Sequence, residues 1–222
     1  MIAIGKFRAS INESCLILRK LEILVDVNNY PIYDSSFMGR VRPLSYFDQW
    51  KLCVREHYYD CLLSDHSFIQ FNNDPYPSYS YYQFPLDALS FSEYADREFG
   101  KGWEYYAYEV REAYDQYLET QDRLRNVTPI RYDYDPTCYQ SGRHPAAHVH
   151  IGLTNNIRIG ADRQMAPLSF ILFILRQCYP DHWDRFKELY KGKPIFKEVR
   201  DNIDKVPKKY WNPSDFHEVY LT

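Results

Sequence analysis

The sequence lacks paired cysteines and long apolar stretches, and each absence argues against a class of protein. The five cysteines of the 222-residue chain are scattered and form no CxxC pair, which argues against a disulfide framework and against a four-cysteine zinc site. The longest uncharged apolar run covers residues 170–175, far below the ~20 residues that a membrane-spanning helix needs. The first residues also lack the apolar core of a signal peptide. We therefore expect a cytoplasmic protein with no membrane segment.

A surplus of positive charge is also missing. The formal net charge is −3 at pH 7, so no global field draws the chain to nucleic acid, although this value is compatible with a local basic patch. Glycine is scarce, with 8 residues, whereas tyrosine and phenylalanine number 22 and 13. Tyrosine has an apolar ring and a polar tip, which suits a half-buried core position or an interface. Both uses remain open for this tyrosine-rich chain.

Local patterns predict helices grouped between strands that are joined by short turns. The predicted helices cover residues 10–28, 45–56, 90–125, 167–179 and 182–190, and residues 31–44 are predicted to form a loop. The predicted strands cover residues 58–63, 68–71, 79–84, 130–135, 147–151 and 157–159. This order predicts an α+β fold with an antiparallel sheet packed against helices.

Two helices and the chain ends complete this prediction. The segment at about 167–179 is apolar on almost every side, which predicts a largely buried helix beneath the sheet. The apolar stripe between residues 103 and 118 is also expected to pack on the sheet. We expect residues 1–192 to form a single α+β domain. Residues 193–222 show no readable period and are assigned as a C-terminal extension.

Three consecutive predicted strands carry polar side chains on one face and apolar side chains on the other. Because side chains alternate along a strand, Arg131 and Asp133 share one face of the first strand. His148 and His150 share one face of the second, and Arg158 opposes two isoleucines in the third. If the strands are neighbours, carboxylate, imidazole and guanidinium groups come within a few ångströms of one another.

This grouping is suited to acid–base chemistry on a phosphodiester. His148 and His150 are the predicted catalytic groups, and Asp133 can fix an imidazole tautomer. Arginines can bind a phosphate and stabilise charge that develops on it. The predicted substrate-binding residues are Arg131, Arg143, Arg158 and, at the rim, His144. RNA is a suitable substrate because its own 2′-hydroxyl supplies the nucleophile.

Two alternatives remain open for the same residues. A solvated sheet face shows the same alternation, so the polar side chains could be purely structural. A divalent metal could also bind at His144, His148 and His150, with Asp133 as a fourth ligand. The spacing matches no metal signature well: a His-x-His metal site would need a glutamate soon after, or Asp-His where Gly152 and Leu153 stand. We therefore expect no cofactor and no bound metal.

Several motifs resemble one bacterial family. Residues 131–136 (RYDYDP), 144–152 (HPAAHVHIG), 157–159 (IRI) and 167–176 (PLSFILFILR) resemble the family called domain of unknown function 2290. Residues 63–71 and 81–85 are similar to its middle part. The resemblance covers residues 10–190 and implies a cytoplasmic bacterial setting and one domain. More distantly, RYD followed by a histidine-rich strand is similar to TumE-like toxin proteins, a class tied to toxin–antitoxin modules and RNA cleavage.

Two functional hypotheses follow from these observations. The leading one is a metal-independent ribonuclease, or another phosphodiester-acting protein, of a bacterial defence or toxin–antitoxin type. The competing one is a non-catalytic module whose tyrosine-rich surface binds a partner protein.

Overall fold

The computed structural model describes residues 2–28, 35–124, 126–154, 157–201 and 203–222. Eight strands in this part of the chain form one sheet, in which they follow one another in sequence order. Every neighbouring pair is antiparallel except the last, which is parallel. The strands are β1 (Leu24–Val27), β2 (Cys61–Leu63), β3 (Phe68–Asn72), β4 (Ser78–Tyr82), β5 (Ile130–Tyr134), β6 (Ala147–Ile151), β7 (Ile157–Ala161) and β8 (Tyr220–Leu221).

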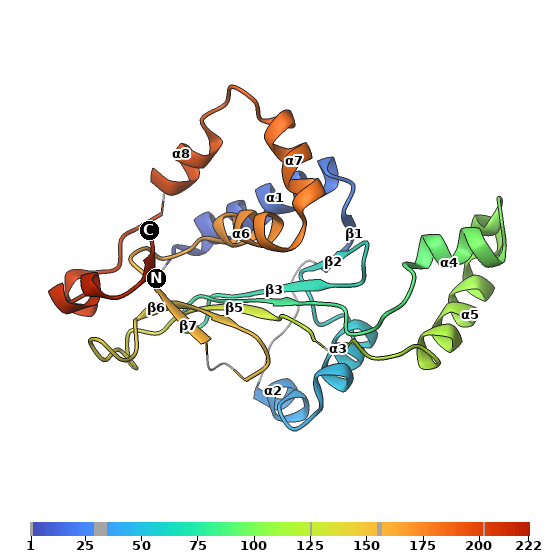
Figure 1. The fold of residues 1–222 in the computed structure, drawn as a ribbon, viewed down its shortest axis with the longest axis horizontal. Coiled ribbons are helices and arrows are strands. Elements are labelled where there is room, and N and C mark those ends of the chain that lie inside the picture. The colour runs from blue at the N-terminus through green and yellow to red at the C-terminus, as the bar shows by residue number, and fades with distance from the viewer. Residues whose placement is uncertain (1, 29–34, 125, 155–156, 202) are drawn as a thin grey trace.

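Helices lie on both faces of this sheet and beyond one end of it (Figure 1). This arrangement confirms the predicted α+β class with a mostly antiparallel sheet. The described α-helices are α1 (Ile4–Lys20), α2 (Ser35–Val41), α3 (Tyr46–Arg55), α4 (Phe91–Glu98), α5 (Ala107–Glu119), α6 (Pro167–Cys178), α7 (Pro180–Leu189) and α8 (Ile195–Asp201).

The first face of the sheet is covered by α1 and α6, and the main core lies between them and the strands (Figure 1). The prediction of a buried helix is confirmed by α6, in which Phe170 and Ile171 are completely buried. The Phe170 ring packs against Tyr79 of β4 with 5.8 Å between ring centroids. Proline at the start of α6 suits the helix, because the first amides need no intrahelical partner. No helix among the described residues is both long and apolar enough to cross a lipid bilayer.

The second face is covered by α2 and α3 at only one end. Side chains alternate along β3, so Ile69 belongs to the main core while Phe68 belongs to a second cluster with Trp50 of α3. Phe37 of α2 joins this second cluster, which covers the sheet from β2 to β4. The remainder of this face, on β5, β6 and β7, carries the polar residues.

The helices α4 and α5 form an arm that projects past the end of the sheet (Figure 1). A capping box at Ser90, where a helix was predicted to begin, precedes α4, and Ser90 Oγ accepts a hydrogen bond from the amide of Glu93. The apolar stripe of this region was predicted to pack on the sheet, but it does so only at its end, where Leu118 packs against the second cluster. Val110 and Tyr114 of α5 are fully buried, but Tyr114 packs against Phe91 and other aromatic rings of the arm. Most of the stripe therefore packs between α4 and α5 and does not cover strands.

The predicted helix at 10–28 needs correction. Helix α1 begins at Ile4 and ends at Lys20, and residues 24–27 form β1 instead. Ser10, where the predicted helix began, lies inside α1, and its Oγ accepts a hydrogen bond from the amide of Leu168. The helical spacing of Leu24 and Val25 is overridden because pairing with β2 satisfies the backbone of this edge segment.

The predicted loop at 31–44 also contains a helix, α2, at residues 35–41. Residues 31–34 of that prediction lie outside the described part of the chain. The Phe37 ring stacks on Tyr58 with 3.5 Å between centroids. This tertiary contact, rather than a local periodicity, accounts for the helix.

The last thirty residues return to the sheet. Strand β8 pairs in parallel with β7, and Trp211 is buried in the main core. Asp215 accepts hydrogen bonds from the Tyr139 hydroxyl at 2.7 Å and from the amide of Gly142 at 2.8 Å. The C-terminal segment therefore holds the loop between β5 and β6, which carries two of the predicted site residues.

His66 lies where the arm meets the sheet. It occupies the β2–β3 turn with φ of 63°, is 9% exposed, and stacks on Tyr114. Its Nε2 accepts a hydrogen bond from the amide of Phe91, which requires the neutral ring. Burial, followed by the charge of Arg111, lowers the pKa of His66 to about 4.

We predict that stability falls as the pH drops from about 6.5 towards 4, because the unfolded chain binds the His66 proton and the folded chain does not. At pH 5 the loss of unfolding free energy that is linked to His66 protonation is about 2 kcal/mol. The variant His66→Asn tolerates the left-handed backbone and should show a correspondingly shallower loss of unfolding free energy in urea titrations. His217→Asn, at an exposed position, is the control. Identical pH slopes for His66→Asn and wild type would contradict the assignment.

Candidate functional site

The site is built from two cross-strand rows on the uncovered end of the second face. One row runs Ser78, Asp133, His148 and Gly160 across β4, β5, β6 and β7. The next row runs Ser80, Arg131, His150 and Arg158 across the same strands. The intervening residues of these strands point into the core beneath α6, so the apolar packing orients both rows.

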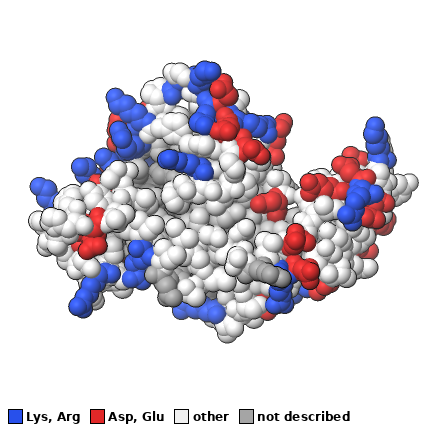
Figure 2. All heavy atoms as spheres, viewed as in Figure 1, with Lys and Arg blue, Asp and Glu red and all other residues white. Residues whose placement is uncertain are grey.

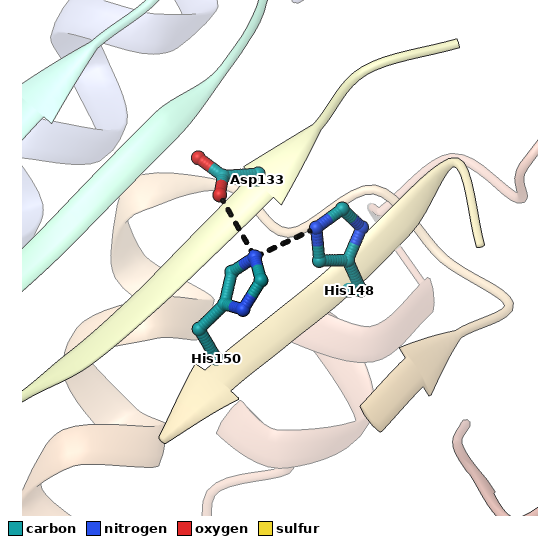
Figure 3. Close-up of side chains that lie close together, drawn as sticks. All are labelled: Asp133, His148 and His150. Carbon is teal, nitrogen blue, oxygen red and sulfur yellow. Dashed lines mark hydrogen bonds and ion pairs between the residues drawn. The ribbon is translucent and has the colours of Figure 1, made fainter. Parts of the chain in front are cut away.

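Three side chains of these rows meet at one point (Figure 3). The Nε2 atoms of His148 and His150 are 3.0 Å apart, and Asp133 Oδ2 lies 3.5 Å from His150 Nε2. The predicted contact between carboxylate and imidazole is therefore present. It is diagonal: Asp133 is paired in register with His148 but reaches the ring of His150. His148 and His150 are 2% and 3% exposed.

The tautomer of His148 follows from its contacts. Its Nδ1 lies 2.8 Å from the carbonyl oxygen of Pro145 and must donate, because a carbonyl only accepts. Burial, with the neighbouring His150 ring as the second cause, holds the pKa of His148 well below its usual range. His148 is therefore neutral near pH 7, with the lone pair of Nε2 directed towards His150.

Asp133 is held through both of its oxygens. Ser78 Oγ donates to Oδ1 at 2.7 Å, and Arg131 Nε donates to Oδ2 at 2.7 Å. The Asp133 side chain is 20% exposed and that of Arg131 40%, so this ion pair lies at the boundary between the protein and the solvent. The two bonds fix the carboxylate beside His150.

These residues line a cleft of about 650 Å³ on the second face. Most of the predicted substrate-binding residues reach it: Arg131, Arg158 and His144 are part of its wall. Arg143 is not, and instead lines a smaller pocket of about 140 Å³ beside Trp211. His144 packs edge-on against His148 with 4.9 Å between ring centroids. Its buried Nδ1 has no hydrogen-bond partner among the described residues.

Ser78 and Arg42 are among the cleft residues that sequence reasoning missed. Ser78 alternates with Ser80 along β4, and this period of two could have placed it on the polar face. Arg42, which follows α2, lines this cleft and also a neighbouring one of about 470 Å³. No local pattern identifies Arg42, because it lies just after α2, in a segment that was predicted to be a loop.

The cluster has the donor atoms of a metal site. One ligand atom each from Asp133, His148 and His150 lies within 4.8 Å of the others. This set differs from the one considered on the sequence, in which His144 was a ligand. His144 instead lies at the rim of the cluster.

We expect Ser78→Ala to lower the free energy of unfolding by about 1 kcal/mol, because Asp133 loses a hydrogen bond at a half-buried position. Ser80→Ala is the matched control on the same strand face. Urea titration of both variants measures the difference. Equal midpoints would show that the Ser78 hydroxyl does not support the carboxylate.

Comparisons with known proteins identify one family. The family model described as "Uncharacterized conserved protein (DUF2290)" matches residues 12–211. The curated proteins contain no match to the chain, and neither do the solved structures. The likeness to TumE-like toxins therefore rests on the RYD motif and the histidine-rich strand alone. The family match spans all of β2 to β7 and thus the whole polar cluster. The protein belongs to the family of uncharacterised conserved proteins designated DUF2290.

Proposed function

We propose that the protein cleaves phosphodiester bonds of RNA in the cleft on the second face. One observation carries the proposal: His150 lies in register between Arg131 and Arg158 on three adjacent strands. A phosphate bound by the two guanidinium groups would sit beside the buried imidazole cluster. Asp133, fixed by Ser78 and Arg131, completes the cluster.

The proposed reaction uses the substrate's own nucleophile. The 2′-oxygen attacks the adjacent phosphorus, the bond from phosphorus to the 5′-oxygen breaks, and a 2′,3′-cyclic phosphate forms. The 2′-hydroxyl gives up its proton to a base in the cleft, and the departing 5′-oxygen receives one. Arg131 and Arg158 would stabilise the negative charge that develops on the phosphate.

The contacts of the two histidines bear on how they take part. Direct proton transfer by both rings is the simplest version and needs no metal. However, both nitrogens of His148 are already engaged, one with the Pro145 carbonyl and one with His150. These contacts favour a bound cation over direct proton transfer by His148, because a cation uses the same nitrogen positions.

We expect wild-type protein to cleave total RNA and the double variant His148→Ala/His150→Ala to be at least about 100-fold slower. A control double variant, His182→Ala/His217→Ala, also removes two histidines but lies outside the cleft. Gel analysis of RNA fragments and of their cyclic phosphate ends, with and without EDTA, measures the reaction. Failure of folded wild-type protein to cleave RNA, with or without added divalent metal, would refute the proposal.

Within this proposal the cleavage serves a bacterial defence or toxin–antitoxin role. Expression of wild-type protein, but not of the His148→Ala/His150→Ala variant, should then arrest bacterial growth. Equal growth with both proteins, at equal expression, would contradict the toxin role and would leave the proposed RNA cleavage to be judged by the gel assay alone.

A second candidate function is supported by the arm. Tyr79 and Tyr81 of β4 lie in the core, so these two tyrosines do not form a binding surface. In contrast, Tyr105, Tyr106 and Tyr108 are 89%, 64% and 73% exposed at the junction of the two arm helices. Acidic side chains gather over the same arm (Figure 2). This surface suits a partner protein with a basic face.

A photo-crosslinking side chain at position 105 tests this second candidate. A discrete adduct with one basic protein, lost when Tyr106→Ser and Tyr108→Ser are added, is the expected result. The added changes lie at exposed positions and should alter stability by no more than about 0.5 kcal/mol each. Adducts that survive both changes would exclude the tyrosine surface as the contact.

A further inference from the structure

We infer that Asp133, His148 and His150 bind one divalent transition-metal ion, of the class represented by zinc. A carboxylate oxygen and two imidazole nitrogens lie within 4.8 Å of one another at the floor of the cleft. Two nitrogen donors and one oxygen donor are a ligand set of catalytic zinc sites, whereas magnesium prefers oxygen donors alone. The inference does not depend on the proposed RNA cleavage, because metal binding is measured directly.

The contact between the two histidines is the first argument. Their Nε2 atoms lie 3.0 Å apart, and the lone pair of His148 Nε2 already points towards His150. If both nitrogens carried only lone pairs they would repel, so the metal-free protein needs a proton between them. A metal ion can replace this proton and accept both lone pairs.

The surroundings of the ligands are the second argument. Ligating imidazoles commonly donate their other ring nitrogen to a carbonyl or carboxylate, which fixes the tautomer that binds metal. His148 does so to the Pro145 carbonyl at 2.8 Å. Ligating carboxylates are likewise hydrogen-bonded, and Asp133 has Ser78 and Arg131 as partners. The cluster therefore has an outer shell of the kind that orients metal ligands.

The charge of the cleft is the third argument. The lining alone has no excess positive charge, because its arginines are balanced by its aspartates. The arginines are Arg42, Arg131 and Arg158, and the aspartates are Asp74, Asp133 and Asp135. A divalent cation would make the cleft electropositive, which suits an anionic substrate. Three protein ligands also leave a coordination position for water or a substrate oxygen.

The exposure of the ligands fixes the side on which that open position lies. The His148 and His150 rings are almost completely buried, whereas the Asp133 side chain is 20% exposed. A bound ion would therefore be reached from the cleft, past Asp133 and Arg131. His144, edge-on to His148, borders the ion without ligating it.

Titration of chelator-treated protein with Zn²⁺ tests the inference. Calorimetry should show one ion per chain, and Co²⁺ should give visible d–d absorption with nitrogen ligands. His150→Ala and Asp133→Ala should each weaken binding by at least about tenfold. Asp135→Asn, on the same face of the chain as Asp133, is the matched control and should bind as wild type does. Circular dichroism verifies that each variant is folded.

Arg158→Gln gives a sharper comparison. Arg158 lines the cleft in register with His150 and is not one of the hydrogen-bond partners of Asp133 named above. Its loss should leave Zn²⁺ binding equal or tighter, while RNA cleavage should fall because the phosphate loses a ligand. A general loss of structure would lower both. This variant therefore separates the metal site from the substrate site.

Four results would overturn the inference. The first three are Zn²⁺ binding by wild type no tighter than by His148→Ala/His150→Ala, binding of Mg²⁺ in place of Zn²⁺, and equal Zn²⁺ affinity in the Asp135→Asn control and the ligand variants. The fourth is RNA cleavage that persists in EDTA by protein unable to bind Zn²⁺, which would leave the proposed function standing. Tight Zn²⁺ binding without RNA cleavage would support the inference and remove the proposed function.

Discussion

The cross-strand register of β4 to β7 is the constraint on which the site depends. Antiparallel pairing sets Asp133 beside His148 and Arg131 beside His150, and alternation sends Tyr132 and Val149 to the opposite face. A slip of β6 by one residue would turn both histidines towards α6 and expose Val149. The apolar contacts beneath α6 oppose that slip, because they would lose completely buried side chains. The hydrophobic core on one face of the sheet thus positions the polar cluster on the other face.

Uneven coverage of the sheet makes this cluster accessible. Helices α1 and α6 cover the first face, while α2 and α3 cover only one end of the second (Figure 1). The histidine rings remain buried beside the cleft, which would be costly without hydrogen-bond partners. The Pro145 carbonyl and the Asp133 carboxylate supply those partners, and Arg131 joins the network by donating to Asp133. Connected networks of this kind hold a single arrangement, because each bond limits the geometry of the next.

Charge links the proposed cation to the proposed substrate. The chain carries a net charge of −3, and acidic side chains gather over the arm (Figure 2). Attraction for a phosphodiester must therefore arise locally, from the arginines of the cleft and from the cation that we infer there. The same cation would relieve the close approach of the two Nε2 atoms. One ion would thus account for both the geometry of the cluster and the electrostatics of its cleft.

The sequence by itself determined the strands of the site and the face on which each residue lies. Alternation in residues 130–135 and 147–151 is a local property of the backbone, so Asp133, His148 and His150 could be grouped from it. Tertiary structure decided the rest. Pairing with β2 made residues 24–27 a strand, and packing on Tyr58 made residues 35–41 a helix. Distant contacts alone bring Arg42 into the cleft and draw the C-terminal segment onto β7. None of these has a local signature, because each depends on residues far apart in the chain.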